Sequence, residues 1–263
     1  MSLRSLARRL SSMAGQFVVE PCAPATLAVV GEAARFPVRR VYCVGRNYKD
    51  HAVEMEAKQK DLGISKGDQV HDPPFFFQKP GVGAIIDASA GAGAVAKYPM
   101  KTALFEFELE LVVALKSGGE KIPVAKALDA VYGSALGVDL TRRDLQHAAK
   151  ATRRPWDAAK GFDDSAPCGA LVPGFVPAGD VTLTLAANGD VKQQCRVDQM
   201  IFDVAHIIHH LSHEVELKAG DVIFTGTPAG VGPLDPGDAV ECTAAAADGG
   251  EALPRCAFSV GAR

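Results

Sequence analysis

Residues 105–113, FEFELELVV, constrain the fold more than any other segment of the chain. Apolar and acidic side chains alternate along this segment, and a period of two residues is that of a β-strand rather than a helix. One face of the strand would be apolar and buried, while Glu106, Glu108 and Glu110 would share the opposite face. We therefore expect a β-sheet that carries a row of carboxylates on one side.

A row of carboxylates requires a positive partner. Successive side chains on one face of a strand are about 6.7 Å apart at the backbone, which lets two glutamates converge on one ion. Like charges in a row repel, so a cation is expected to offset them. Because oxygen ligands favour hard cations, the pattern indicates Mg²⁺, with Mn²⁺ or Ca²⁺ as alternatives. The competing interpretation is an ordinary half-exposed strand with solvated glutamates.

Asp139 is a candidate for a third oxygen ligand. It lies at the end of the apolar run GSALGVDL, and a carboxylate in a buried segment is costly without a partner. The alternative is a role at a helix start, because residues 141–152 are expected to form a helix. Thr141 would cap that helix, and Asp144 would lie in its first turn.

A second candidate constellation lies in VGRNYKDHAVEM, residues 44–55. On a helix, His51 and Glu54 occupy positions i and i+3 and therefore share a face. A carboxylate beside an imidazole orients the ring and raises its basicity, which suits a general base acting on water. The alternative is an incidental pair on the protein surface, and the spacing alone favours that alternative.

Two segments suit an anionic ligand. The segment TRRDLQ, residues 141–146, places Arg142 and Arg143 at a helix start, just after Asp139. The segment TGTPAGVG, residues 225–232, is a glycine-rich turn whose N–H groups and threonine hydroxyls could hold a carboxylate. It lacks the lysine of a phosphate-binding loop, so nucleotide binding is not indicated.

Other basic residues are less specific. Lys79 and Lys160 are single cations in turn-like settings, and each could be a surface lysine. Four residues follow the helical spacing of a zinc stripe: His206, His209, His210 and His213. No H-E-x-x-H pattern is present and no cysteine is near, so a solvated or subunit-facing helix surface is the preferred interpretation.

The remaining periodicities predict a β-rich α+β fold. Strands outnumber helices and do not alternate regularly with them, which argues against a doubly wound nucleotide-binding fold. The Asn188-Gly189 pair is a favoured hairpin turn, and residues 61–74 read as a loop. Helices are expected at 47–60, 141–152 and 202–214, and strands at 38–44, from 75, and at 105–115, 132–139, 181–187, 190–195, 221–226, 239–243 and 256–260.

Composition narrows the class of protein. A chain of 263 residues, 48% hydrophobic and 22% charged, fits one large globular domain. A net charge of −3 and a pI of about 6.2 give no electrostatic case for nucleic acid, and no apolar run is long enough to span a membrane. The six cysteines form no C-x-x-C pair and are expected to be reduced thiols in an intracellular compartment.

The N-terminal region differs in composition from the rest. Residues 1–19 contain arginines, serines and leucines but no acidic residue, a pattern typical of a mitochondrial transit peptide. The alternative is an unremarkable tail or a misplaced start. We expect residues 1–35 to be an N-terminal extension, a candidate transit segment followed by an arm, and residues 36–263 to be the main domain. The compartment would be the mitochondrial matrix, or otherwise the cytoplasm.

Four blocks in a fixed order resemble the fumarylacetoacetate hydrolase family: VYCVGRNYKDHAVEM, FELELVVALKSGG, ALGVDLTRRDLQ and GDVIFTGTPAGVG. RRPWDAAKGFD, residues 153–163, extends the match, which covers residues 36–260. FPVRRVYCVGRNY, PPFFFQKP and TRRDLQ are similar to acylpyruvases and to fumarylpyruvate hydrolases in particular. The resemblance implies the family's C-terminal-type fold, a mixed β-sheet rolled around a metal site, and a homodimer.

The resemblance also implies roles for individual residues. His51 and Glu54 match a water-activating dyad on a lid that orders over the substrate, and Lys160 matches a catalytic lysine that approaches the substrate. The residues that match the metal ligands are Glu108, Glu110 and Asp139. The residues that match substrate contacts are Arg46, Lys79, Arg143, Gln146 and Thr227.

The implied activity is Mg²⁺-dependent hydrolysis of a carbon–carbon bond in a small keto acid, an acylpyruvate such as fumarylpyruvate, to pyruvate and a carboxylic acid. The same metal site could instead support oxaloacetate decarboxylation, tautomerisation or isomerisation of an unsaturated dioate, which need no attacking water. A metal-binding module without catalysis is a third alternative. The chain departs from the family where Glu106-Phe107 replaces a frequent histidine before the first metal glutamate, and where residues 55–73 lengthen the segment after the lid helix.

Overall fold

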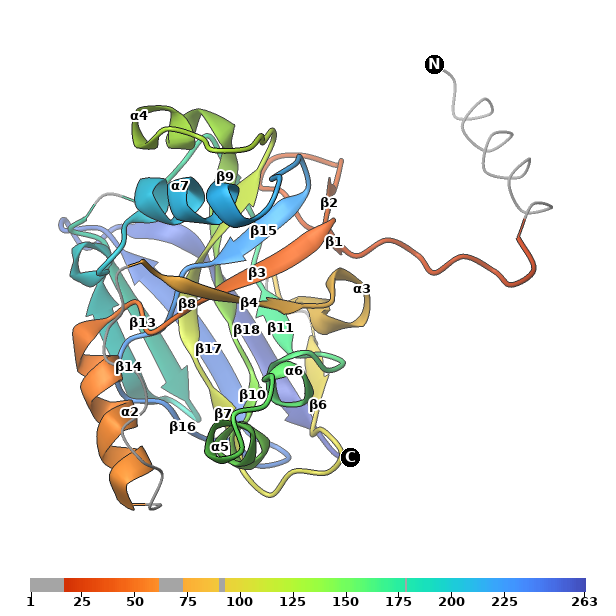
Figure 1. The fold of residues 1–263 in the computed structure, drawn as a ribbon, viewed down its shortest axis with the longest axis vertical. Coiled ribbons are helices and arrows are strands. Elements are labelled where there is room, and N and C mark those ends of the chain that lie inside the picture. Colours follow the sequence, from red (N-terminus) through yellow and green to blue (C-terminus); the bar gives the residue numbers. More distant parts are fainter. Residues whose placement is uncertain (1–16, 62–72, 90–92, 178) are drawn as a thin grey trace.

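The computed structural model describes residues 17–61, 73–89, 93–177 and 179–263, and its fold is the β-rich α+β fold that the sequence predicts (Figure 1). The central sheet has eight strands and is mixed, because β15 pairs with β3 and β11 pairs with β5 in parallel while the other neighbours are antiparallel. Its order is β4 (Phe75–Lys79), β3 (Arg40–Gly45), β15 (Asp221–Phe224), β8 (Leu109–Leu115), β9 (Val131–Val138), β11 (Ala166–Cys168) and β5 (Ile85–Asp87), with β12 (Val172–Pro173) paired to β9.

Three smaller sheets complete the strand framework. Two of them are short: β1 (Thr26–Leu27) with β2 (Phe36–Pro37), and β10 (Thr141–Arg142) with β7 (Phe105–Phe107) and β16 (Gly232–Pro233). The third has five strands, in the order β14 (Asp190–Arg196), β13 (Thr182–Ala187), β17 (Ala239–Ala245), β18 (Glu251–Gly261) and β6 (Val95–Lys97). The predicted hairpin through Asn188-Gly189 is the β13–β14 pair.

Strand β8 is buried on both faces. Leu109, Leu111 and Val113 enter a core that β8 shares with the five-stranded sheet and with helix α7 (Val204–Glu214). Val112 and Ala114 enter a second core on the opposite face. Of the alternating acidic residues, only Glu110 lies in β8, at its start, where the site lies.

The helices lie around the sheets. Helix α7 packs against α4 (Val124–Ala127) at one end of the molecule, and Asp203 caps it by accepting a hydrogen bond of 2.9 Å from the backbone N–H of His206 (Figure 1). Helix α2 (Lys49–Asp61) lies at the periphery (Figure 1). The others are α3 (Gly81–Ala84), α5 (Arg143–Ala151) and α6 (Asp157–Lys160), with single 3₁₀ turns at Leu128–Ala130 and Val197–Gln199.

The predicted helix at 141–152 begins two residues later than expected. Thr141 is paired with Glu106 in the β10–β7 ladder, so it does not cap α5, whose N-cap is Arg142 without a side-chain hydrogen bond. Asp144 instead accepts hydrogen bonds from Thr102 Oγ1 at 2.5 Å and from the Ala103 N–H at 2.8 Å. Tertiary pairing of β10 has replaced the local cap.

The predicted strand at 105–115 is interrupted at Glu108, and its two halves, β7 and β8, belong to different sheets. The predicted loop at 61–74 falls mostly outside the described residues. So does the candidate transit segment, of which only the exposed Phe17, Val18 and Val19 are described. Within the arm, Leu27 and Val29 are buried, and Val29 forms a β-bridge with Leu171.

The six cysteines are free thiols, and all except Cys22 are buried. Among the described residues, no helix is both long enough and apolar enough to cross a membrane.

Candidate metal centre and active site

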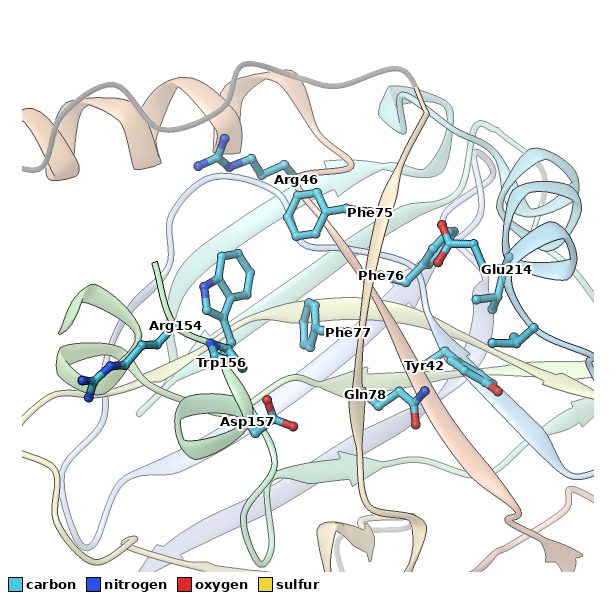
Figure 2. Close-up of a pocket in the computed structure, with 13 residues that line it drawn as sticks. Tyr42, Arg46, Phe75, Phe76, Phe77, Gln78, Arg154, Trp156, Asp157 and Glu214 are labelled. Carbon is cyan, nitrogen blue, oxygen red and sulfur yellow. The ribbon is translucent and has the colours of Figure 1, made fainter. Parts of the chain in front are cut away.

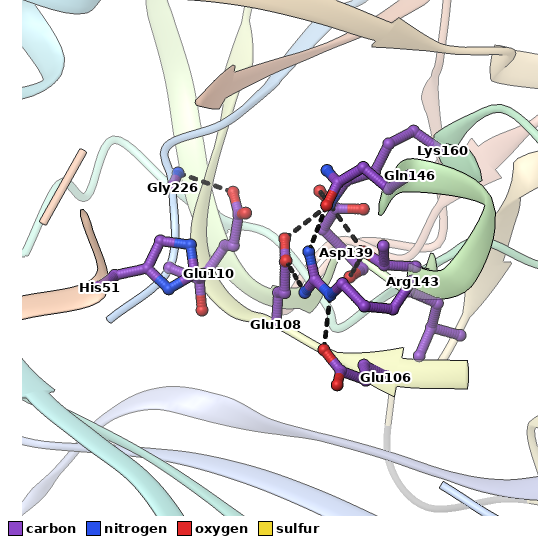
Figure 3. Close-up of polar contacts among 12 residues, drawn as sticks. His51, Glu106, Glu108, Glu110, Asp139, Arg143, Gln146, Lys160 and Gly226 are labelled. Atoms are coloured by element: carbon purple, nitrogen blue, oxygen red, sulfur yellow. Dashed lines mark hydrogen bonds and ion pairs between the residues drawn. The ribbon is translucent and has the colours of Figure 1, made fainter. Parts of the chain in front are cut away.

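The interruption at Glu108 brings three carboxylates together. Glu110 lies on β8 opposite Gly137 of β9, and Asp139 follows the end of β9. The backbone N–H of Asp139 donates a hydrogen bond of 2.8 Å to the carbonyl oxygen of Glu108. One oxygen from each of Glu108, Glu110 and Asp139 then lies within 4.8 Å of the others, and the three residues are only 5%, 2% and 0% exposed (Figure 3). No second group of acidic, histidine or cysteine residues with such spacing is found in the part of the chain that the structure describes.

The pKa values of Glu108 and Glu110 are shifted in opposite directions by their surroundings. Burial acts to raise the pKa of Glu108, but the nearby Lys160 and Arg143 outweigh it and hold the pKa well below its usual range. The pKa of Glu110 is raised well above its usual range, first by burial and then by the negative charges of Asp139 and Glu108. The cluster therefore favours an additional positive charge beside Glu110.

Asp139 offers an oxygen to such a charge. Lys79 Nζ lies 2.8 Å from Asp139 Oδ1, but its hydrogen bonds go to the carbonyl oxygens of Leu140, at 3.0 Å, and Lys160, at 2.6 Å. Asp139 Oδ1 is buried and accepts no hydrogen bond from any described residue. Oxygen ligands of this kind suit a hard divalent cation, so these residues fit the ion that the sequence pattern indicates. The solvated strand that competed with this interpretation is wrong, because all the glutamates of the row are buried.

Lys160 ties the cluster together. Its Nζ donates hydrogen bonds to Glu108 Oε2 and Asp139 Oδ2, each at 2.6 Å, and to Thr141 Oγ1 at 2.7 Å. Burial acts to lower its pKa, but Asp139 and Glu108 outweigh burial, so the pKa is raised. Lys160 is thus a buried ammonium within the site, and Lys79 is buried as well; neither is a surface lysine.

Arg143 and Glu106 form a second, connected pair. Arg143 Nε donates to Glu106 Oε2 at 2.6 Å, its Nη2 donates to Glu108 Oε1, and its Nη1 donates to Gln146 Oε1 at 2.6 Å (Figure 3). Glu106 therefore does not join the other two glutamates but neutralises Arg143. Arg142, its neighbour in the sequence, points elsewhere: it donates to the carbonyl oxygen of Met100 at 3.1 Å and stacks on Phe162.

Helix α2 delivers His51 to the same pocket. His51 is buried and lines the pocket with Glu108, Glu110 and Thr227, so the pair with Glu54 is not an incidental surface pair. His51 Nδ1 lies 3.6 Å from Glu54 Oε2, beyond hydrogen-bonding distance, and accepts or donates no hydrogen bond among the described residues. Glu54 Oε2 also accepts a hydrogen bond of 3.1 Å from the N–H of Gly230.

The glycine-rich turn holds a carboxylate of the protein itself. The N–H of Gly226 donates to Glu110 Oε2 at 2.7 Å, and Gly226 has a φ of +99°. A Cβ there would lie 2.6 Å from Cβ of Asn47, so only glycine fits. Thr227 Oγ1 accepts a hydrogen bond of 2.9 Å from Gln193 Nε2, whereas Thr225 Oγ1 donates to the carbonyl oxygen of Leu111. Thr227 faces the pocket and Thr225 does not.

An aromatic wall separates this pocket from a larger cavity. The space directly over the carboxylates is about 30 Å³, and an adjoining cavity of about 770 Å³ lies along β4 (Figure 2). Both are lined by Arg46, Phe75, Phe77 and Trp156. Arg46 has a φ of +57°, a left-handed conformation that is uncommon for arginine and that directs the chain between β3 and α2.

Asn47 and Lys150 are parts of the site that the sequence analysis did not identify. The side-chain amide of Asn47 donates hydrogen bonds to the carbonyl oxygen of Thr225, in the glycine-rich turn, and to that of Phe202, just before α7. No pattern in the sequence signals such long-range pairs. Lys150 also lines the pocket. Its position could have been found, because it lies seven residues after Arg143 and four after Gln146 on one helix.

The histidine stripe of α7 does not form a metal site. His209 Nδ1 is 2.8 Å from the carbonyl oxygen of Ile122, His213 Nδ1 is 2.8 Å from that of His209, and His206 Nδ1 is 2.8 Å from Asp203 Oδ1. These contacts turn the ring nitrogens toward different partners.

The fold and the carboxylate pocket define the class of protein. The C-terminal sequence model of the fumarylacetoacetate hydrolase family matches residues 40–260, and the chain belongs to this family. It is 36% identical to the mitochondrial oxaloacetate decarboxylase of Dictyostelium discoideum, over 78% of this chain and 88% of that protein. It is 37% identical to the mitochondrial oxaloacetate tautomerase of Mus musculus, over 77% of this chain and 86% of that protein.

The structure is similar to that of fumarylpyruvate hydrolase from Pseudomonas aeruginosa, which was crystallised in complex with Mn²⁺ and pyruvate. The two superpose with a TM-score of 0.84 at 38% sequence identity, over 94% of this chain and 100% of that chain. The family to which this chain belongs therefore includes a hydrolase, a decarboxylase and a tautomerase.

Proposed function

We propose that the chain is a divalent-metal-dependent enzyme that acts beside the ketone of a short 2-oxo acid. The observation that supports this most strongly is the convergence of Glu108, Glu110 and Asp139 in a buried pocket that His51 also lines. Glu108, Glu110 and Asp139 would hold the cation, Mg²⁺ or Mn²⁺. When bound, a divalent cation supplies Lewis-acid polarisation of the substrate's carbonyl and carboxylate oxygens.

The first candidate reaction is hydrolysis of an acylpyruvate such as fumarylpyruvate. His51 would remove a proton from water, with Glu54 orienting the imidazole, and the hydroxyl would add to the distal carbonyl carbon. The carbon–carbon bond then breaks toward the pyruvate fragment, whose C3 takes up a proton to become a methyl group. The products are pyruvate and a carboxylate. The buried position of His51 and the similarity to fumarylpyruvate hydrolase support this candidate.

The other pocket residues would position the substrate. Lys160, held cationic by Glu108 and Asp139, would place positive charge beside the acid end of the substrate. Gln146 and Thr227 would orient it, and Arg143 would keep Glu108 fixed. Lys79 supports the backbone at Leu140 and Lys160, so we propose that it acts on the substrate only indirectly. Arg46, with Phe75 and Trp156, would close the outer side of the pocket against water.

The second candidate is decarboxylation or tautomerisation of oxaloacetate. The names of the two mitochondrial relatives support it more directly than they support hydrolysis. Neither reaction consumes water, so neither needs His51 as a base toward water, although tautomerisation needs some group to move a proton at C3.

A turnover screen distinguishes the candidates. The protein loaded with Mg²⁺ or Mn²⁺ would be supplied with acetylpyruvate, fumarylpyruvate and oxaloacetate, and pyruvate release and enol absorbance would be followed. Rapid pyruvate release from acylpyruvates supports hydrolysis, and action on oxaloacetate alone supports the second candidate. Tight Mn²⁺ binding without turnover of any of the three would overturn both and leave a metal-binding module.

Two further properties are proposed from the sequence and the relatives. Residues 1–19 would direct the protein to the mitochondrial matrix, where the two relatives also reside by name, and a fluorescent protein carrying this segment tests the targeting. A homodimer would show twice the mass of the 27.6 kDa chain in light scattering.

A further inference from the structure

The face of helix α5 that carries Arg143 and Gln146 carries a third polar residue, Lys150. Arg143, Gln146 and Lys150 occupy positions i, i+3 and i+7, so they lie on the same side of the helix. Arg143 and Gln146 face the carboxylates and bond to each other. Lys150 lies one turn further out and lines the same pocket.

Lys150 differs from the other cations of the pocket in its partners. Lys160, Lys79 and Arg143 each approach a buried carboxylate within 2.8 Å. Lys150 instead lies over the ring of Trp156, with Nζ 4.9 Å from the ring centroid, and no carboxylate of a described residue pairs with it. It is partly buried, so its charge is poorly served by water.

The charge balance of the pocket favours an anion at this point. The buried acidic residues Glu106, Glu108, Glu110 and Asp139 are already opposed by Lys79, Arg143 and Lys160. A divalent cation would add two positive charges, and Lys150 adds one. The outer part of the loaded pocket would therefore carry excess positive charge that a single substrate carboxylate cannot offset. Consistent with this, burial and the charges of Arg143 and Arg46 lower the pKa of Lys150 to about 7.

We infer that Lys150 binds the second carboxylate of the substrate, so that the site selects 2-oxo diacids over 2-oxo monoacids of the same length. The inference rests on the proposed function, which places the 2-oxo acid end of the substrate at Glu108, Glu110 and Asp139. The distal carboxylate would then lie on the outer side, beside Lys150. Lys150 acts as a specificity-determining residue, and Trp156 fixes the direction of its side chain.

Binding of matched ligand pairs tests the inference without turnover. Titration calorimetry on the Mn²⁺-loaded protein would compare 2-oxoglutarate with 2-oxopentanoate, and 2-oxoadipate with 2-oxohexanoate, which differ only in a terminal carboxylate or methyl group. We expect at least one diacid to bind about 10- to 100-fold more tightly than its partner, the range for a hydrogen bond between charged groups. Lys150→Met keeps the alkyl contact with Trp156 and should abolish this preference, while Lys150→Arg should retain most of it.

Controls separate failure of this inference from failure of the proposed function. Lys116→Met removes the same charge from an exposed position and should leave both ligand pairs unchanged. Monoacid binding without a diacid preference, or a preference that survives in Lys150→Met, overturns the role of Lys150 and leaves the proposed function intact. If no 2-oxo acid binds the Mn²⁺-loaded protein at all, the proposed function fails and the inference fails with it.

Discussion

The floor and the cover of the pocket are built in different ways. The floor comprises Glu108, Glu110, Asp139, Arg143 and Lys160, all of them buried. Direct hydrogen bonds join four of these residues to one another, and the N–H of Gly226 donates to the fifth, Glu110. The cover comprises His51 and Glu54 of α2 together with Arg46 and Lys150. Its contacts are longer: 3.6 Å from His51 to Glu54, 3.1 Å from Glu54 to Gly230, and 4.9 Å from Lys150 to the ring of Trp156.

This difference follows from where the residues lie. The carboxylates of the floor lie on or next to central strands whose two faces are buried, and Arg143 and Lys160 are themselves buried, so these side chains have little freedom. Helix α2 is peripheral and contributes only His51 and Met55 to the buried interior among its described side chains. A cation site gains from fixed geometry, whereas a base and a carboxylate clamp must admit and release a substrate. We therefore expect variants of the floor to abolish metal binding, and variants of the cover to spare it.

Asp139→Asn should have the largest effect. The amide keeps the shape of the side chain but removes one anionic oxygen and the counter-charge of Lys160. Mn²⁺ affinity should fall by more than about 100-fold, since even residues that only support metal ligands contribute about 10- to 100-fold. Turnover should fall to background.

Electron paramagnetic resonance of bound Mn²⁺ measures the effect directly. Asp190→Asn, at an exposed aspartate that begins β14, serves as the matched control. Unchanged Mn²⁺ affinity in Asp139→Asn would remove Asp139 from the ligand set and undo the distinction between floor and cover.

His51→Gln should show the opposite pattern. Loss of a general base costs about 10²- to 10⁴-fold in rate, so acylpyruvate hydrolysis should fall by that order while Mn²⁺ affinity stays within twofold, within about 0.4 kcal/mol. Oxaloacetate decarboxylation, if the protein catalyses it, should fall less because it needs no activated water. His213→Gln, on the exposed side of α7, should leave all three quantities unchanged. Wild-type hydrolysis in His51→Gln would assign the base elsewhere.

The floor was more predictable from the sequence than the cover. Alternation in a strand places Glu108 and Glu110 on one face, and the cost of burying an unpaired carboxylate points to Asp139. These are local rules. Alternation failed for Glu106 because the strand breaks at Glu108, and the capping rule failed for Thr141 because β10 pairs with β7. Such pairing depends on residues far apart in the sequence. The spacing of His51 and Glu54 was visible, but whether that helix face was buried was not. Lys150 was missed although its helical spacing was present in the sequence.

Glu106→Gln tests the support beneath the floor. Glu106 accepts from Nε of Arg143 while Glu108 accepts from Nη2, and loss of the Glu106 charge should weaken a buried hydrogen bond between charged groups, worth about 1.5–3 kcal/mol. We expect the free energy of unfolding in urea to fall by this amount and Mn²⁺ affinity to fall only modestly. The control is Glu241→Gln, whose ion pair with Arg255 spans 3.4 Å at the surface and should contribute at most about 1 kcal/mol. Equal losses in the two variants would show that Glu106 is not part of a rigid floor.

The smallest expected effect is a pH dependence of the cover. Burial and the positive charges of Arg143 and Arg46 lower the pKa of Lys150 to about 7, and Glu108, Lys160 and His51 also face the pocket. Below the pKa, Lys150 is charged and ready to bind a carboxylate; above it, the protein must take up a proton to do so. A divalent cation would move the midpoint lower, not higher.

Diacid affinity should therefore fall by at least about tenfold between pH 6 and pH 8, since each pH unit above the midpoint removes about 1.36 kcal/mol of binding free energy. The matched monoacid serves as the internal control, because pH effects on metal binding or on folding would affect both ligands alike. In Lys150→Arg the guanidinium stays charged throughout this range, so the difference between diacid and monoacid should become independent of pH. If the diacid preference is the same at pH 6 and pH 8 in the wild type, Lys150 does not titrate in this range, and its charge does not distinguish the cover from the floor.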